Sequence, residues 1–432
     1  MIRISFFTLG CKVNQYETQA LSQRFSTEGF LCCPEGEDAD VYIINSCTVT
    51  AQGDRKTRQL LRRLRREHPE AAIALTGCYP QAFPEEATAL TEVDILTGSK
   101  DRGGLVTAVR QFLATRQRVV AIQPHRAGDS FEAMSGEDSA SKTRAFIKIE
   151  DGCENFCAYC IIPYARGPVR SKPMEELHRE LLQAVAAGHR EVVLLGINLG
   201  SYGRDTGKRL IDAIELSCSI EGIDRVRLGS VEPDLLTPED IRRMSVQEKF
   251  CPQFHLSLQS GCDTVLTRMG RHYTTADYLA IVSEIRRCFP DAALTTDMMV
   301  GFPGESDQEF DLSVAFARQI GFAKIHAFVY SPRTGTPAAT MSGQVTSQVK
   351  KQRINRLLAE ADSLRTTFLQ GMVGSVQQVL FEGGMHNGVQ TGYTKNYTPV
   401  SVCETEVLKG NIISVLITEV AGDGCTGILM PV

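Results

Sequence analysis

Features that mark membrane-spanning, secreted and strongly basic proteins are missing from this 432-residue chain. It has no run of about 18 or more apolar residues, so no transmembrane helix is expected. Residues 1–11 contain only a short apolar stretch and no small-residue cleavage site, so they lack the layout of a signal peptide. The net charge of −5 argues against nucleic-acid binding over the whole surface and leaves only local basic patches. We therefore expect a cytoplasmic protein that binds neither a membrane nor DNA.

Cysteine, in contrast, is plentiful, with 14 residues. In a cytoplasmic chain this content favours metal binding over disulfides. The hydrophobic content of 43% and the charged content of 22% are those of an ordinary globular protein. The length suggests about two to four domains.

The strongest local pattern is a group of three cysteines, Cys153, Cys157 and Cys160, spaced as C-x3-C-x2-C. It directly follows an apolar, strand-like run at residues 145–149. Thiolates are the ligands that iron–sulfur clusters take, and three of them leave one iron of a four-iron cluster open for chemistry. The alternative is a structural zinc site. Such a site needs a fourth ligand, usually from a second cysteine pair, and none stands nearby.

This motif after a first strand resembles that of the radical S-adenosylmethionine (SAM) superfamily, and Tyr159 matches the aromatic residue that commonly precedes the third cysteine. The resemblance implies that the open iron is chelated by the amino and carboxylate groups of SAM. It also implies that an electron from the cluster cleaves the sulfonium and yields a 5′-deoxyadenosyl radical.

A second group of cysteines lies in the first 124 residues. Cys11, Cys47 and Cys78 each follow a short apolar run within a few residues, and helical stretches separate these runs. Strand–helix alternation predicts a parallel α/β sheet, and ligands gather at the carboxyl edge of such a sheet. Three cysteines could therefore converge on a second cluster. The alternative is that they are small buried thiols at loop starts.

The sequence around these cysteines resembles the methylthiotransferases, which are radical SAM enzymes with two clusters. Residues 8–18 resemble the opening of that family, and residues 45–50 and 76–79 resemble its other two cluster stretches. The Cys-Lys-Val-Asn start at 11–14 matches neither the isopentenyladenosine branch nor the ribosomal-protein branch, so the chain is most similar to the tRNA branch acting on N6-threonylcarbamoyladenosine. The resemblance implies that Cys11, Cys47 and Cys78 hold the auxiliary cluster that handles the inserted sulfur.

A basic helix is predicted between the second and third of these cysteines. The stretch from Arg55 to Arg66 has seven basic residues and no acid, with leucines at helical spacing. A cationic face of this kind attracts phosphates without reading sequence, so we expect contact with RNA. The alternative is an ordinary solvated helix face.

Six strand-like runs separated by helical patterns recur between about residues 145 and 331. This alternation predicts a chain of βα units, too short to close an eight-stranded barrel. A partial (βα)6 radical SAM barrel, over residues 145–365, is also what the resemblance implies. Residues 125–144 are rich in Ser, Gly, Asp and Glu and are interpreted as a linker between it and the first domain, residues 1–124.

Polar residues at the carboxyl ends of the barrel strands are candidates for binding SAM. Asn198 follows Gly196 at a position where the family often has a Gly-Gly-Glu stretch, of which only the first glycine is present. The other candidates, by strand, are Ser230 and Glu232 (third), Gln259 (fourth) and Asp297 (fifth). His255 and His326 fall inside strands and are expected to fill or line the barrel, with no assigned role.

The C-terminal residues 366–432 change to short β-like runs with glycine turns, after an amphipathic helix at 345–370. This predicts a small all-β barrel of the OB-like class, at the place where the resembling enzymes carry a tRNA-binding TRAM domain. Tyr393 and Tyr397 flank Lys395 and suit base stacking. Residues 371–432 hold two lysines against five acids, however, so the alternative is a barrel that only packs against the core.

Together these observations predict an α/β enzyme with two [4Fe-4S] clusters, which uses SAM as methyl donor and as radical source. The predicted reaction adds a methylthio group to C2 of N6-threonylcarbamoyladenosine beside the anticodon of tRNA. An electron donor of flavodoxin or ferredoxin type and a sulfur source are also expected. Two other substrates remain open, isopentenyladenosine in tRNA and a ribosomal-protein aspartate. A non-catalytic iron–sulfur protein that binds RNA or senses redox state is the alternative of another class.

Overall fold

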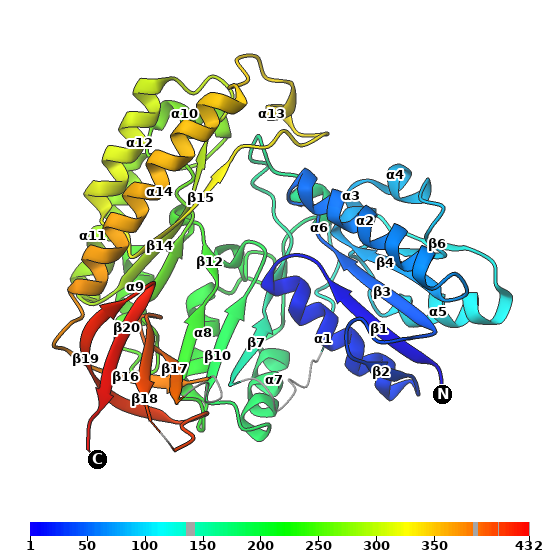
Figure 1. Cartoon of the computed structure of the whole chain (residues 1–432), viewed down its shortest axis with the longest axis horizontal. Helices are drawn as coiled ribbons and strands as arrows, with labels where there is room; N and C mark the ends of the chain where they lie inside the picture. The colour runs from blue at the N-terminus through cyan, green and yellow to red at the C-terminus, as the bar shows by residue number, and fades with distance from the viewer. Residues whose placement is uncertain (135–142, 383–387, 405, 432) are drawn as a thin grey trace.

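The computed structural model of the chain describes residues 1–134, 143–382, 388–404 and 406–431. Three sheet systems follow one another along the chain: a parallel sheet, a partial barrel and a small closed barrel. In Figure 1 the parallel sheet (blue to cyan) lies beside the partial barrel, and the closed barrel (orange to red) lies below it. No helix in the described part of the chain is long and apolar enough to cross a membrane.

The first sheet has six parallel strands in the order β2-β1-β3-β4-β5-β6. Its strands are β1 (Arg3–Thr8), β2 (Leu31–Cys33), β3 (Val41–Ser46), β4 (Ala72–Gly77), β5 (Ile95–Thr97) and β6 (Val119–Ala121), and its helices are α1 (Lys12–Thr27), α2 (Ala51–Glu67), α3 (Cys78–Ala82), α4 (Pro84–Thr88) and α5 (Gly104–Thr115). Strands β3 and β4 are buried along their whole length. Ile43 and its neighbour Ile44 belong to two separate hydrophobic cores, because alternate residues of a strand face opposite sides of the sheet. The predicted parallel α/β sheet is therefore confirmed.

The central part is the predicted partial barrel, and all six expected strands are present. They are β7 (Arg144–Lys148), β10 (Glu191–Leu195), β11 (Arg225–Leu228) with β12 (Ser230–Val231), β13 (Gln253–Leu256), β14 (Ala293–Val300) and β15 (Lys324–Val329). The third strand is split at Gly229, so β11-β10-β7 and β12-β13-β14-β15 are two parallel sheets.

Helices cover the outer face of this barrel and enclose the largest hydrophobic core of the chain. The helices of the central part are α6 (Ile162–Arg166), α7 (Met174–Ala186), α8 (Leu210–Ser219), α9 (Pro238–Ser245), α10 (Asp263–Met269), α11 (Thr275–Cys288), α12 (Asp307–Ile320), α13 (Pro337–Thr340) and α14 (Ser347–Gln370). Two short 3-10 turns, Leu199–Ser201 and Pro233–Leu235, and a small hairpin of β8 (Glu150–Asp151) and β9 (Arg170–Ser171) complete it. In Figure 1, α11, α12 and α14 lie on one side of the barrel, and α1 of the first domain lies on the other, next to β7.

The C-terminal part is a closed five-stranded barrel in the order β16-β17-β18-β20-β19, consistent with a TRAM-like domain. Its strands are β16 (Val376–Phe381), β17 (Val389–Thr394), β18 (Pro399–Cys403), β19 (Ile412–Ala421) and β20 (Gly424–Leu429). The sequence prediction missed β17 because its inward positions are polar or small: Gln390, Gly392 and Thr394 are buried. A side chain at Gly392 would come within 2.5 Å of the Leu380 carbonyl oxygen, so only glycine fits there.

The predicted base-stacking surface at Tyr393 and Tyr397 is wrong, because these rings lie in the junction with the central barrel. The two rings stack on each other at 4.6 Å, and the guanidinium of Arg227 lies 4.6 Å from the Tyr397 ring. Arg144 lies over both rings, at 5.2 and 4.9 Å. Arg225 donates to the carbonyl of Tyr393 at 2.9 Å. The ring faces are therefore occupied by arginines of the central strands.

The described part of the predicted linker packs against the first domain. Met134 is buried in the same core as Ile43, and Tyr16 donates to its carbonyl. His125 hydrogen-bonds Ser99 at 2.8 Å. Residues 135–142 of this linker lie outside the described part of the chain.

Candidate functional site

The loop that carries Cys153, Cys157 and Cys160 runs from β8 to α6. Its backbone is anchored at both ends, since Cys153 donates to the Gly167 carbonyl (3.0 Å) and Ala158 donates to the Met269 carbonyl (2.8 Å). Gly152, just before it, has a φ of +97°. A side chain there would come within 2.0 Å of the Pro168 carbonyl oxygen, so glycine is required.

The thiols of this loop are held in their neutral form by burial. Burial raises the pKa of Cys153 to about 11 and that of Cys160 to about 12. A bound metal removes the proton of a thiol outright, so these side chains need a metal to become thiolates near neutral pH. Cys157 has a cationic neighbour instead: Nη1 of Arg271 lies 3.2 Å from its Sγ.

The second group of cysteines is brought together by the topology of the first sheet. Cys11, Cys47 and Cys78 follow β1, β3 and β4, which are adjacent in the order β1-β3-β4. The carboxyl ends of adjacent parallel strands meet at one edge. The loops touch there: a side chain on Gly10, whose φ is +128°, would come within 2.6 Å of the Cys47 Cβ. Burial raises the pKa of Cys78 to about 12.

Arg166 connects the two groups. It ends α6, the helix that follows Cys160, and its Nε lies 3.2 Å from the Sγ of Cys78 in the first domain. Its Nη2 donates to Asn14 Oδ1 at 3.0 Å. The side chain is 0% exposed, so this guanidinium is fully buried against Cys78 and Asn14 of the first domain.

A buried charge network surrounds Arg166. Glu17 of α1 accepts from Arg166 (2.5 Å) and Lys148 (2.7 Å), and Arg102 forms an ion pair with it at 2.8 Å. Burial alone would raise the pKa of Glu17, but these three cations outweigh it and hold the pKa at about 2. Asp151 takes the same role on the barrel side, where it accepts from Lys148 at 2.6 Å and Arg166 at 3.4 Å. The network thus joins the first domain to the barrel by fully ionised pairs.

A third connection comes from the segment after β15. Nη1 of Arg333 pairs with Asp54 Oδ2 at 2.5 Å, and its guanidinium lies 4.5 Å from the Phe83 ring. Arg333 also donates to Thr48, next to Cys47. Farther along, the amide of Ala338 donates to the carbonyl of Ala158, inside the loop of Cys153 to Cys160, at 2.8 Å.

Several buried polar atoms beside the Cys153 group have no hydrogen-bond partner among the described residues. They are Asn198 Oδ1, Gln259 Oε1, Glu150 Oε1 and Ser201 Oγ. Gln259 has a φ of +65°, in the left-handed region that a non-glycine residue adopts at a cost. Unpaired polar atoms in a strained site fit a polar ligand such as SAM.

Some of the predicted SAM contacts have a free polar atom or lie near the cysteines, and the others are already paired with another residue. Asn198 is near the cysteines, with its Nδ2 3.7 Å from Cys153 Sγ, and Gly196 packs against Glu150, whose Oε2 would lie 2.6 Å from an added Cβ. Gln259 lies just after β13, which ends at Leu256, and has a free amide oxygen. Three others already have partners: Glu232 pairs with Arg271, Ser230 bonds Ser257 at 3.0 Å, and Asp297 lies 3.4 Å from His255.

Glu150 was not predicted from the sequence, although it lies close to the cysteines. Its Oε2 accepts from the Asn198 amide at 2.7 Å. Burial, with the neighbouring Asp151 second, raises the pKa of Glu150 to about 8. Arg166, Glu17 and Arg333 were also missed, because an arginine or a glutamate in a single sequence carries no sign of its distant partner.

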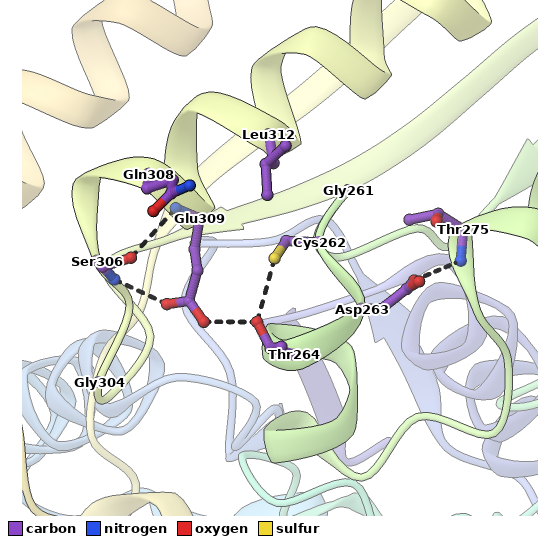
Figure 2. Close-up of a pocket in the computed structure, with 10 residues that line it drawn as sticks. All are labelled: Gly261, Cys262, Asp263, Thr264, Thr275, Gly304, Ser306, Gln308, Glu309 and Leu312. Carbon is purple, nitrogen blue, oxygen red and sulfur yellow. Dashed lines mark hydrogen bonds between the residues drawn. The ribbon is translucent and has the colours of Figure 1, made fainter.

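Among the described residues no three His, Cys, Asp or Glu side chains are placed to hold one metal ion. A four-iron cluster takes one thiolate per iron, so its ligands stand farther apart than those of zinc. The pocket in Figure 2, between α10 and α12, contains none of the predicted site residues, and its Glu309 is already bonded to Thr264, Ser306 and Arg268.

Comparison with known proteins assigns families to both large parts of the chain. Residues 3–98 match the Uncharacterized protein family UPF0004, and residues 147–317 match the Radical SAM superfamily. The chain is 38% identical to the threonylcarbamoyladenosine tRNA methylthiotransferase MtaB of Bacillus subtilis, over 96% of this chain and 94% of that protein. It is 33% identical to a tRNA-2-methylthio-N(6)-dimethylallyladenosine synthase of Pelotomaculum thermopropionicum, over 99% and 98%.

A solved structure supports the fold alone. The radical SAM methyltransferase TsrM of Kitasatospora setae superposes with a TM-score of 0.59 at 12% identity, covering 84% of this chain and 89% of TsrM. The radical SAM match implies a [4Fe-4S] cluster and SAM as cofactors.

Proposed function

Since the chain belongs to the radical SAM tRNA methylthiotransferases, we propose that it transfers a methylthio group to C2 of N6-threonylcarbamoyladenosine next to the anticodon of tRNA. Relatives named for threonylcarbamoyladenosine reach 38% identity over nearly the whole chain, and this likeness supports the choice of substrate. The observation that carries the proposal is the enclosed Arg166. This residue follows the loop of Cys153, Cys157 and Cys160 in the chain, and its Nε lies 3.2 Å from Cys78 Sγ of the other group, which supports a site shared by both groups.

We assign a [4Fe-4S] cluster to each group of cysteines. Cys153, Cys157 and Cys160 hold the radical-generating cluster, and Cys11, Cys47 and Cys78 hold the auxiliary cluster. When bound, the clusters and SAM supply the one-electron cleavage of SAM, the methyl group and the sulfur transfer. The order of β1, β3 and β4, which brings the loops of Cys11, Cys47 and Cys78 to one edge of the sheet, supports the assignment of the auxiliary cluster.

The chain's own residues bind and orient SAM. Asn198 and Gln259 offer unpaired amide oxygens to its donor groups, and Gly196 leaves room above Glu150. Ser230, Glu232 and Asp297 would exchange their present partners for groups of SAM. The buried network of Glu17 and Arg166 excludes water between the two cysteine groups, which protects a reactive site from side reactions.

RNA contact is assigned to the exposed face of α2. Arg55, Lys56, Arg62 and Arg66 are exposed there. Arg65 is not available, since it pairs with Asp94 at 2.5 Å. The electron donor is of flavodoxin or ferredoxin type, and the sulfur source is a separate partner. The functional units are residues 1–124, 145–365 and 366–432, joined by 125–144.

Mass spectrometry of tRNA nucleosides from cells lacking the gene tests this function. The 2-methylthio derivative of threonylcarbamoyladenosine should disappear and return with the intact gene. It should not return with Cys157→Ala or Cys78→Ala. Cys403→Ala, at an exposed cysteine outside both groups, is the control and should restore it. An unchanged level of this nucleoside in the deletion strain would refute the substrate assignment.

The same extracts separate the alternatives. Loss of the methylthio derivative of isopentenyladenosine, or of the modified ribosomal protein, would identify one of the other substrates. The non-catalytic alternative predicts no 5′-deoxyadenosine when the reduced, reconstituted protein is mixed with SAM. We expect this product to form.

A further inference from the structure

The inner wall of the partial barrel carries two histidines that have no assigned role in binding SAM. Alternate residues of a strand face opposite sides, and Phe254, Leu256 and Ile325 face the helices in the main core. His255 and His326 occupy the other positions of β13 and β15 and therefore face the interior of the barrel. Their rings lie 5.7 Å apart. His326 is exposed, so this wall is not covered by other side chains.

Lys12 enters the same space from the first domain. It begins α1, directly after Cys11. The next residue, Val13, is buried against Val193 and Leu195 of the barrel strand β10. The ammonium of Lys12 lies 6.0 Å from the ring of Phe146 on β7. The first turn of α1 therefore fills the open side of the barrel and directs an exposed lysine at the inner wall.

The other charged groups around this space have partners of their own, which leaves Lys12 and His326 available to bind a ligand. Partial desolvation of the His326 ring lowers its pKa, and the nearby charges of His255 and Lys12 lower it further, so His326 acts as a neutral hydrogen-bond donor and Lys12 is the cation of the group. Asp297 is the acidic group beside them; its carboxylate lies 3.4 Å from His255, and on exchanging this partner for SAM it would leave His255 free. Two other charged groups on the inner faces are paired: Lys148 with Glu17, and Lys324 with Asp423. Among the described residues, no ion pair involves Lys12.

We propose that Lys12 and His326, supported by His255, bind the carboxylate of the threonyl group and thereby select this substrate over an apolar N6 substituent. The inference rests on the proposed function. The N6 substituent of threonylcarbamoyladenosine carries a carbamoyl group, a hydroxyl and a carboxylate, whereas that of isopentenyladenosine is a hydrocarbon. The carboxylate is the one anionic group among them and calls for a cation and hydrogen-bond donors. A site built for such groups rejects analogues that lack them, because its own polar groups would then stay unpaired. Lys12 adjoins Cys11, so a substituent held by it lies beside the proposed auxiliary cluster.

The proposed contact of Lys12 and His326 with the threonyl carboxylate is tested by changing these residues and the carboxylate in the same set of binding measurements. The reconstituted, unreduced protein is titrated with two anticodon stem-loops, one carrying threonylcarbamoyladenosine and the other its methyl ester. Wild type should bind the acid about tenfold more tightly than the ester. Lys12→Gln should lower this ratio, and Lys12→Gln with His326→Gln should bring it to about one. Lys12→Arg keeps the cation and should keep the ratio.

Lys56→Gln on α2 is the matched control. It removes a lysine from the proposed RNA face, so it should weaken acid and ester equally and leave the ratio unchanged. Iron content of each variant shows that it is loaded and folded. A ratio that Lys12→Gln and the double variant leave at the wild-type value overturns the inference.

Failure of the inference and failure of the proposed function give different results. If wild type converts the threonylcarbamoyladenosine stem-loop on reduction, yet the ratio does not depend on Lys12 and His326, only the inference is overturned. If wild type converts an isopentenyladenosine stem-loop instead, both are overturned.

Discussion

The two groups of cysteines are built in different ways. Cys153, Cys157 and Cys160 come from one loop, held by backbone hydrogen bonds on both sides. Cys11, Cys47 and Cys78 come from three strand ends, and only the order of the sheet brings them together. Each group has an arginine at one thiol, Arg271 at Cys157 and Arg166 at Cys78. The arginine at Cys78 belongs to the other domain. A substitution at the first-domain group should therefore also destabilise the interface between the domains, whereas a substitution in the loop of Cys153 to Cys160 should have a smaller effect on stability.

The largest effect is expected for Arg166→Met. The change leaves Glu17 and Asp151 with fewer cations in a buried network, and breaking a buried pair costs about 3–5 kcal/mol. Urea unfolding and iron content should both show the loss. Arg190→Met is the control, since Arg190 pairs with Asp224 while 44% exposed, and an exposed pair contributes about 1 kcal/mol or less. Equal losses for the two variants would contradict the comparison.

Next in size is a difference in pH dependence between the two groups. Glu150, beside the Cys153 loop, has a pKa raised to about 8, and Glu17, in the interface, has one lowered to about 2. Between about pH 4.5 and 8 folded Glu150 holds a proton that the unfolded chain has released, so stability falls as pH rises. Glu17 is ionised in both states above about pH 5 and adds no slope there.

Glu150→Gln removes the titration and keeps the shape of the side chain. Its stability relative to wild type should rise by about 2 kcal/mol from pH 6 to pH 8, because the slope is about 1.4 kcal/mol per pH unit well below the pKa and falls to half of that at pH 8. Glu17→Gln is the control: its stability difference from wild type should be constant over the same range. Urea unfolding at pH 6, 7 and 8 measures both. A constant difference for Glu150→Gln would mean that this carboxyl is ionised in the folded protein.

A smaller effect is expected at the bridge between the segment after β15 and the first domain. Asp54→Asn removes the ion pair with Arg333 but leaves that guanidinium over the Phe83 ring, so we expect a loss of about 2 kcal/mol. Asp311→Asn, at an exposed pair with Arg356, is the matched control and should change stability by less than about 1 kcal/mol. The two losses are compared by urea unfolding. A loss no greater than the control's would show that the bridge contributes little to docking.

The contrast between the groups also explains what the sequence could predict. The fold class followed from strand–helix alternation, and the cysteine loop is a local pattern. The cysteines of the first domain could be interpreted because strand ends of a parallel sheet share an edge. The partners of Arg166 could not be found this way, because Glu17 is 149 residues away in sequence.

The wrong predictions in the C-terminal domain also arise from contacts between residues that are distant in sequence. Tyr393 and Tyr397 look like base-stacking residues in sequence, but their faces are covered by Arg144 and Arg227, which belong to strands of another domain. Strand β17 was missed since its inward side is polar, and Gln390 is satisfied there by the Leu408 amide at 2.8 Å. The roles assigned to Ser230, Glu232 and Asp297 stay predictions, because the structure pairs each with another residue.

The smallest effect on the fold, and a distinct effect on function, is expected for Arg62→Glu with Arg66→Glu on α2. These side chains are 67% and 75% exposed, so stability should change by less than about 1 kcal/mol. Binding of tRNA should weaken about tenfold at near-physiological salt, and the dependence of affinity on salt should become shallower. Lys351→Glu on α14 is the control and should leave affinity unchanged. If the α2 variant binds tRNA as wild type does, the basic helix is a solvated face, and RNA is held elsewhere along the two cysteine-bearing domains.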